Sequence, residues 1–311
     1  MSKEIRRVAI IGTGVIGASW AALFLAKGLE VIATDIAPDA EKRLRDFVAA
    51  AWPALEQSGL APGAEPSKLQ FTAILDDAVA GVDLIQENGP ERIEFKKDLY
   101  HHLDEILPAD VIIASSSSGL TASAIQSACE RHPERCVIGH PFNPPHLIPL
   151  VEIVGGSQTS EETIDRATAF YRGLGKRTIR LHKEVPGHVA NRLQAALYRE
   201  IVHLISQDVV SVADADTAVC WGPGLRWGIM GPSLLYHLGG GHGGIEHFFE
   251  QFTGPMTAWW SVLGQPELTP DVRAKVISGV HDMVQARSIG ELETYRDEIL
   301  GGLLSLRRDE D

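Results

Sequence analysis

Two side chains in neighbouring apolar segments, His140 and Glu152, are the residues of this sequence best suited to moving a proton. The run 136–138 predicts a buried strand, and Glu152 lies within a second strand-like run, 150–154. A carboxylate among apolar neighbours needs a hydrogen-bonding partner, because burying it alone is costly. If one imidazole nitrogen of His140 donates to Glu152, the other can act as a general base near neutral pH. The alternative is a core histidine beside an unrelated glutamate.

The segment that must position His140 is rich in proline. Four prolines fall within residues 139–149. Because proline fixes φ and donates no backbone hydrogen bond, this segment predicts a rigid extended loop and excludes a helix. His140 then lies at the end of a strand, where open α/β sheets place their ligands and catalytic groups.

A glycine-rich turn near the N-terminus predicts a dinucleotide-binding site. The turn follows a buried strand at 7–11 and opens a helix at 18–27, which is the context that such a motif requires. The residues expected to contact the coenzyme in this turn are Gly12, Thr13, Gly14, Val15, Ile16 and Gly17. The alternative is a turn with a structural role alone.

Each glycine of this turn has a physical task. Gly12 permits the tight bend, Gly14 lets the backbone approach a pyrophosphate, and Gly17 lets the helix pack closely on the strand. The N-terminus of the helix faces the phosphates. Asp35 ends the next predicted strand, 30–35, and would accept hydrogen bonds from the ribose hydroxyls while repelling a 2′-phosphate. We therefore expect NAD rather than NADP as the cofactor.

Strands and helices alternate through the first part of the chain. Further strands are predicted at 69–72, 82–87, 111–114 and 178–181, and further helices at 39–60, 74–80, 93–106, 121–130 and 163–174. After residues 185–187 only helices are predicted, at 188–208, 212–221, 233–238, 244–252, 270–287 and 289–307. The sequence therefore predicts an α/β protein, with a Rossmann-type dinucleotide-binding domain at 1–186 and an all-α domain at 187–311.

The composition is that of an ordinary globular protein. The 311 residues carry a net charge of −13, which argues against partners such as nucleic acid or an anionic membrane surface. The apolar run 8–26 resembles a leader or anchor, but its glycines and the following strand favour a strand-turn-helix. Three cysteines indicate a reducing compartment, and we expect a cytoplasmic protein.

No metal site is predicted. Cys129, His132, Cys136 and His140 have a spacing similar to that of zinc ligands. The first cysteine ends a predicted helix, however, the second begins a strand, and His140 has a better role beside Glu152.

Taken together, these motifs resemble the 3-hydroxyacyl-CoA dehydrogenase superfamily over nearly the whole chain. The segments that carry the resemblance are Gly12–Gly17, the serines 115–118, His140–Pro144, Glu152 and Pro186–Arg192. The resemblance implies an NAD-binding α/β domain followed by a helical domain that forms a homodimer. It also implies oxidation of a small-molecule 3-hydroxy acid.

The resemblance assigns roles to individual residues. It implies that His140 is the catalytic base, that Glu152 orients it, and that Ser118 and Asn191 hold the reacting oxygen. Substrate contact is implied for Asn143. The residues that fall where the family contacts the nicotinamide half of NAD are Glu91, Lys96 and Ser116.

Three positions depart from the family pattern. Ser116 replaces a usual asparagine, Gly119 replaces a serine, and His188 stands where an aromatic residue is common. The base and its carboxylate are unchanged, so these departures weaken the case for an acyl-CoA substrate while leaving the chemistry intact.

A narrower resemblance concerns the substrate. Segments 52–55, 86–92, 224–232, 238–245 and 286–292 resemble the branch of the superfamily that oxidises L-carnitine to 3-dehydrocarnitine. Because a trimethylammonium group is recognised by aromatic faces, Phe142 and Phe252 are predicted substrate contacts, and Arg226 could bind the carboxylate. The alternatives are an L-gulonate 3-dehydrogenase, an L-3-hydroxyacyl-CoA dehydrogenase and, more remotely, a non-catalytic NAD-binding or structural protein.

Overall fold

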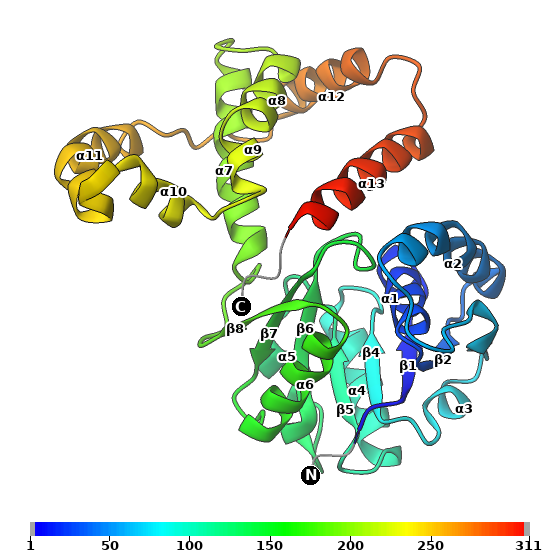
Figure 1. Cartoon of the computed structure of the whole chain (residues 1–311). Helices are drawn as coiled ribbons and strands as arrows, with labels where there is room; N and C mark the ends of the chain where they lie inside the picture. The colour runs from blue at the N-terminus through cyan, green and yellow to red at the C-terminus, as the bar shows by residue number, and fades with distance from the viewer. Residues whose placement is uncertain (1–3, 308–311) are drawn as a thin grey trace. The chain divides into compact units, whose positions relative to one another are not determined.

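A computed structural model describes residues 4–307 of the chain. The chain forms two compact units (Figure 1). The first runs to Asn191 and also contains Ile299–Ser305, and the second comprises Arg192–Glu298. The first is an α/β unit and the second is helical, which confirms the predicted fold class of a Rossmann-type domain followed by an all-α domain.

The first unit is built on one eight-stranded sheet with the strand order β3-β2-β1-β4-β5-β6-β7-β8. The strands are β1 (Arg7–Ile11), β2 (Glu30–Thr34), β3 (Leu69–Phe71), β4 (Leu84–Glu87), β5 (Ile112–Ser115), β6 (Cys136–Pro141), β7 (Leu150–Gly155) and β8 (Arg177–Leu181). All neighbours are parallel except β6 and β7. The order reverses between β1 and β4, which is where doubly wound sheets open a crevice for a ligand.

Helices cover both faces of this sheet because the buried strands are apolar on both sides. In β1, Val8 and Ile10 belong to one core, whereas Ala9 and Ile11 belong to the other, as the period-2 geometry of a strand requires. The first core lies against α1 (Val15–Ala26), α2 (Ala40–Gln57) and α6 (Glu161–Gly173). The second lies against α3 (Leu75–Val79), α4 (Ile93–Ile106) and α5 (Ala122–Gln126).

The expected loop starts at residue 142 and not at residue 139, because β6 continues through Pro141. Pro141 pairs with Val151 of β7, whereas the pairing with β5 ends at Ile138. The missing N–H of Pro141 therefore removes no hydrogen bond from the β5 side. A smaller difference lies in the first helix: α1 begins at Val15 instead of residue 18.

The second unit consists of helices with a small core. The helices after the sheet are α7 (Ala190–Ser206), α8 (Val212–Trp221), α9 (Pro223–Trp227), α10 (Pro232–Gly239), α11 (Gly244–Trp260), α12 (Pro270–Val284) and α13 (Ile289–Leu306). The sequence did not predict α9, and α11 extends beyond the expected end at residue 252, through Pro255. Within residues 4–307 no helix is both long enough and apolar enough to cross a membrane.

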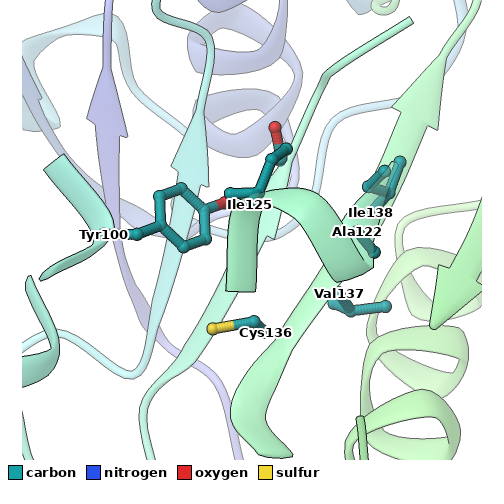
Figure 2. A pocket seen from close by; sticks show the side chains of 7 residues that line it. Tyr100, Ala122, Ile125, Cys136, Val137 and Ile138 are labelled. Carbon is teal, nitrogen blue, oxygen red and sulfur yellow. The ribbon is translucent and has the colours of Figure 1, made fainter. Parts of the chain in front are cut away.

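A small pocket lies between α5 and β6 (Figure 2). Its lining residues are Tyr100, Ser115, Ala122, Ile125, Cys136, Val137 and Ile138. It has no room for a water molecule, and most of its apolar lining belongs to the core of the first unit. It is therefore a packing gap and not a substrate site.

Candidate active site

The pairing of β6 with β7 brings the predicted proton-transfer residues together. His140 and Glu152 are directly opposite each other in the antiparallel register, where side chains on one face are close. The Nδ1 atom of His140 lies 2.8 Å from Oε2 of Glu152. Both residues are buried, His140 with 3% and Glu152 with 0% of its surface exposed.

Both oxygens of Glu152 accept hydrogen bonds, which favours the charged carboxylate. Oε1 accepts hydrogen bonds from the backbone N–H groups of Val189 (2.9 Å) and Ala190 (3.1 Å). Burial works against ionisation, but the bonds from His140, Ala190 and Val189 outweigh it and hold the pKa of Glu152 below its usual value. A carboxylate only accepts, so Nδ1 of His140 must donate. The Nε2 atom of a neutral His140 ring then carries the free lone pair.

Ser118 completes a chain of three groups. Its Oγ lies 3.1 Å from Nε2 of His140 and can donate to that lone pair. Ser118 is exposed although His140 is buried, so the reactive nitrogen lies beneath the surface of the unit at the end of β5. Phe142 packs edge-on to the imidazole with ring centroids 6.0 Å apart. The structure therefore brings together Ser118, His140, Phe142 and Glu152, and the catalytic and substrate-binding roles of these residues remain predictions.

Sequence reasoning gave no site role to His188, which lies against His140. The two imidazole centroids are 5.0 Å apart. The Nε2 atom of His188 is 2.9 Å from the carbonyl oxygen of Ser117, and the residue is 2% exposed. The sequence did contain an indication of this contact. His188 follows Pro186-Gly187 at a position where the family commonly has an aromatic residue, so a second titratable ring lies in a site motif.

The glycine-rich turn leaves open space beside Gly14 at the N-terminus of α1. Gly12 has φ +82°, and a Cβ there would lie 2.7 Å from the carbonyl oxygen of Asn88. A Cβ on Gly17 would lie 1.9 Å from the Gly12 carbonyl oxygen, so neither position accepts a side chain. Gly14, by contrast, has nothing within 4 Å, and no side chain caps the helix. Unpaired N–H groups at an open helix end fit the pyrophosphate of a dinucleotide.

Asp35 is fixed at the carboxyl end of β2 as an acceptor. Its Oδ2 accepts from the backbone N–H (2.7 Å) and hydroxyl (3.0 Å) of Thr13, and its Oδ1 accepts from the N–H of Ala37 (2.8 Å). Partial burial raises the pKa of Asp35, but these hydrogen bonds prevail and lower it. A fixed negative charge beside the glycine-rich turn suits ribose hydroxyls and disfavours a 2′-phosphate.

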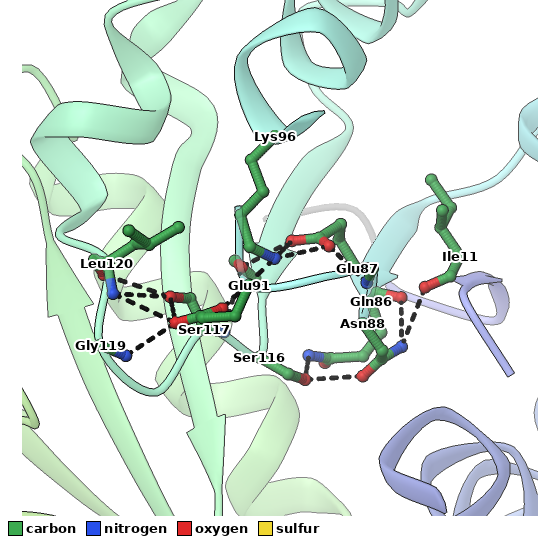
Figure 3. Close-up of polar contacts among 12 residues, drawn as sticks. Ile11, Gln86, Glu87, Asn88, Glu91, Lys96, Ser116, Ser117, Gly119 and Leu120 are labelled. Atoms are coloured by element: carbon green, nitrogen blue, oxygen red, sulfur yellow. Dashed lines mark hydrogen bonds and ion pairs between the residues drawn. The ribbon is translucent and has the colours of Figure 1, made fainter. Parts of the chain in front are cut away.

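Glu91 accepts hydrogen bonds that hold the serine segment, residues 115–120, around Ser118 (Figure 3). Its Oε1 accepts from the hydroxyl of Ser117 (2.6 Å) and from the backbone N–H groups of Gly119 (2.8 Å) and Leu120 (3.2 Å). Partial burial would raise the pKa of Glu91, yet these bonds lower it. Glu91, a predicted coenzyme contact, therefore also supports the segment that carries Ser118.

Lys96 forms an ion pair with the buried carboxylate of Glu87. Its Nζ lies 2.7 Å from both oxygens of Glu87 and 3.9 Å from Oε2 of Glu91 (Figure 3). Glu87 is fully buried and Lys96 is 1% exposed, so each charge requires the other. The ion pair fixes the end of β4 beside the predicted nicotinamide site.

The hydroxyl of Ser116 is saturated by protein groups. It accepts from the amide of Gln86 (2.9 Å) and from the indole of Trp20 (3.2 Å), and it donates to Oδ1 of Asn88 (2.7 Å). A hydroxyl has one proton and two lone pairs. In the described structure Ser116 therefore positions Asn88, whose carbonyl oxygen lies against Gly12.

Two other predicted residues of the first unit remain separate from this chain of groups. Asn191 directly follows Ala190, but among residues 4–307 no described hydrogen bond joins its amide to Ser118. Asn143 is exposed and precedes a cis peptide bond to Pro144.

The remaining substrate candidates lie in the second unit. Arg226 is exposed on α9, and Phe252 stacks on Phe248 with centroids 4.9 Å apart. Their role in the site remains a prediction.

The segment with zinc-like spacing forms other contacts. Cys129 and Cys136 are free thiols with sulfur atoms 3.5 Å apart, and His132 pairs with Glu134. In the part of the chain that the structure describes, no group of three or more His, Cys, Asp or Glu side chains could hold a metal ion.

A Rossmann-type domain with an open glycine-rich turn is suited to binding a dinucleotide, and in this chain a helical domain follows it. Two family models match the chain: the NAD binding domain of 3-hydroxyacyl-CoA dehydrogenase at residues 7–185, and its C-terminal domain at 187–277. The chain belongs to the 3-hydroxyacyl-CoA dehydrogenase family, which confirms the predicted family and coenzyme.

Individual proteins of similar sequence and structure indicate which members of the family the chain resembles. The chain is 48% identical to an L-carnitine dehydrogenase from Streptomyces griseus, over 95% of this chain and 88% of that protein. It is also 48% identical to an L-carnitine dehydrogenase from Pseudomonas putida, over 97% and 94% of the two chains. The crystal structure of 5-formyl-3-hydroxy-2-methylpyridine 4-carboxylic acid 5-dehydrogenase, an NAD⁺-dependent dismutase, matches with a TM-score of 0.84 and 30% identity, over 98% of this chain and 100% of that one.

Proposed function

We propose that this protein oxidises the 3-hydroxyl of L-carnitine to give 3-dehydrocarnitine, with NAD as the coenzyme. The observation that carries the proposal is the buried His140–Glu152 pair with Ser118 at the free imidazole nitrogen. That pair lies in a chain 48% identical to L-carnitine dehydrogenases over nearly its whole length.

The coenzyme site is assigned to residues of the first unit. When bound, NAD supplies the acceptor for the hydride that leaves C3 of the substrate. The open N-terminus of α1 at Gly14 binds the phosphates, and Asp35 accepts from the ribose. We further assign to this site Gly12, Thr13, Val15, Ile16, Gly17, Glu91, Lys96 and Ser116.

His140 removes the proton from the substrate hydroxyl. Its Nδ1 is committed to Glu152, so Nε2 is the atom that accepts. The imidazolium that forms lies beside a carboxylate with a lowered pKa, which stabilises the positive charge. When the substrate is bound, Ser118 donates to the reacting oxygen instead of to Nε2 of His140. By family resemblance, Asn191 is the second partner of that oxygen.

Recognition of the trimethylammonium group is assigned to aromatic side chains. Such a cation donates no N–H hydrogen bond, and an aromatic face stabilises it by about 0.5–1 kcal/mol when exposed and about 2 kcal/mol when desolvated. Phe142 lies beside His140 and is the first candidate. Phe252 is proposed as a second aromatic contact, Arg226 as a partner of the carboxylate, and Asn143 as a further substrate contact.

We also propose a cytoplasmic homodimer with a dinucleotide-binding domain at 1–186 and a substrate and dimerisation domain at 187–311. The helical unit exposes large apolar side chains, including Trp221 (78%), Trp259 (60%) and Trp260 (64%). Exposed large apolar side chains of this kind support association with a second copy.

A substrate panel tests the function. L-carnitine, L-gulonate, 3-hydroxybutyrate and 3-hydroxybutyryl-CoA are each supplied with NAD, and NADH absorbance is followed. We expect the highest kcat/KM for L-carnitine. Equal kcat/KM for carnitine and 3-hydroxybutyrate would refute a cationic substrate, and absence of turnover with every compound would favour a non-catalytic NAD-binding protein.

His140→Gln tests the mechanism. General base catalysis contributes about 10²–10⁴-fold, so kcat should fall by that amount while the Kd for NAD is unchanged. A variant that turns over at nearly the wild-type rate would show that another group takes the proton.

A further inference from the structure

His188 occupies a specialised place in the backbone. It follows Gly187, and both residues have positive φ, +76° for the glycine and +49° for the histidine. This region is uncommon for residues other than glycine, although histidine is enriched there. The turn directs the imidazole inward against His140, and the two residues after it supply the N–H groups that bind Glu152.

The hydrogen bonds of His188 define its protonation state. The carbonyl oxygen of Ser117 only accepts, so Nε2 of His188 carries a proton. The other nitrogen, Nδ1, is buried and has no hydrogen-bonding partner. A charged ring would bury an unpaired N–H at Nδ1, whereas a neutral ring leaves a bare lone pair there, so the neutral form is favoured.

Charged groups approach His188 from three segments. Burial is the largest influence and lowers the pKa of His188, and a positive charge on His140 of β6 lowers it further. The bond to Ser117 and the charges of Glu152 of β7 and Glu91 after β4 act in the opposite direction, but the net shift is downward. Like charges on two rings with centroids 5.0 Å apart repel each other, so the protonation of the two histidines is coupled.

We propose that His188 is a positioning residue for the proton transfer, which as a neutral ring holds the serine segment at Ser117 and adds a second proton-binding group to the acid inactivation of the enzyme. Ser117 directly precedes Ser118, so the bond to its carbonyl fixes the hydroxyl that faces His140. A proton on His188 would oppose the charge that His140 gains during catalysis. This inference rests on the proposed base role of His140.

Two substitutions separate the hydrogen bond from the titration. His188→Gln keeps a donor near the position of Nε2 but cannot take a proton. His188→Phe keeps an aromatic ring and removes both nitrogens. We expect kcat at the optimal pH to be within about threefold of wild type for His188→Gln and to fall roughly tenfold for His188→Phe, the scale of one lost hydrogen bond.

The pH profile gives the readout that a purely structural role would not alter. On the acid side, log(kcat/KM) of the wild type should steepen from a slope of about one toward two, because two coupled imidazoles must lose protons. Both variants should keep a slope of one. A slope of one for the wild type at every acidic pH, or a slope of two for both variants, would overturn the inference.

Imidazole ¹⁵N NMR of the NAD-bound protein tests the same inference without turnover, with His188→Phe assigning the signals. We expect His188 to be neutral and protonated on Nε2 at pH 7, and a doubly protonated ring would overturn the inference. Because the spectrum requires no substrate, failure of the carnitine assay alone would refute the proposed substrate and leave this result standing.

Discussion

Replacement of Glu152 by glutamine should invert the tautomer of His140 with little change in shape. The carboxylate accepts from Nδ1 of His140 on one oxygen and from Val189 and Ala190 on the other. A glutamine offers only one oxygen. If that oxygen stays on the two backbone N–H groups, the amide NH₂ faces Nδ1, which must then accept. The ring proton then lies on Nε2 of His140, which can no longer accept a proton from the substrate.

The structure sets the size of the effect. If the amide oxygen and the NH₂ group of the glutamine exchange places, Nδ1 of His140 can donate again and Nε2 is free to accept. The NH₂ group then faces the backbone N–H groups of Val189 and Ala190, which lose their acceptor. Each buried donor left unpaired costs about 1–3 kcal/mol, so the reactive arrangement lies roughly 2–6 kcal/mol above the blocked one. Since about 1.4 kcal/mol is a factor of ten in rate, kcat should fall by roughly 30-fold to 10⁴-fold.

The assay compares the wild type, Glu152→Gln, His140→Gln and the double variant by NADH formation with L-carnitine. A fluorescence titration with NAD is the control for coenzyme binding, which should be unchanged. Because the pair acts as a unit, the double variant should be no slower than His140→Gln alone. Turnover of Glu152→Gln within threefold of wild type, or additive losses in the double variant, would refute the tautomer argument.

Three further predictions follow from single contacts. Asp35→Asn should reduce the preference for NAD over NADP in kcat/KM by at least about tenfold, because it removes the charge that repels a 2′-phosphate; an unchanged ratio would show that Asp35 does not face the ribose. Phe142→Leu should raise the KM for carnitine several-fold and leave the KM for NAD unchanged, since it removes one aromatic face; an unchanged carnitine KM would exclude Phe142. Burial lowers the pKa of Lys176 to about 7, below its ordinary 10.5, while the side chain donates to the carbonyl oxygens of Pro145 and Ile148. The folded chain therefore binds this proton less tightly than the unfolded chain, so the stability of wild type relative to Lys176→Met should rise between pH 7 and 10.5 by up to about 1.4 kcal/mol per pH unit. Urea unfolding measures this difference, and a value that stays constant with pH would contradict it.

The parts of the site that the sequence predicted are local in the chain. The glycine-rich turn, the helix that follows it and Asp35 lie within one strand-helix-strand unit, so spacing alone places them. The chemistry of His140 and Glu152 also followed from residue type and apolar context. Their actual juxtaposition depends on the antiparallel pairing of β6 with β7, which the prolines concealed, because a proline-rich segment predicts a loop.

The contacts that were missed join segments far apart in the sequence. His188 meets the carbonyl of Ser117, and the Ser116 hydroxyl is shared by Gln86, Trp20 and Asn88. No periodicity encodes such contacts, since they form only when several loops meet at one edge of the sheet. In the helical unit, the far end of α11 was missed because Pro255 is a helix-breaking signal that tertiary structure can override. The helix α9 has only five residues and begins at Pro223, a position where proline is favoured, so it offers too short a pattern to predict.

Two carboxylates determine how the site responds to acid. Glu91 accepts three hydrogen bonds from the serine segment, and Glu152 accepts two from the start of α7 and one from His140. In both, the pKa is lowered despite burial, so each remains charged well below neutral pH. The framework that positions Ser118 therefore persists when a histidine of the site takes a proton. Loss of activity on acidification should consequently be reversible and leave the fold intact, because it arises in the adjacent imidazoles of His140 and His188 and not in the carboxylates that hold the loops.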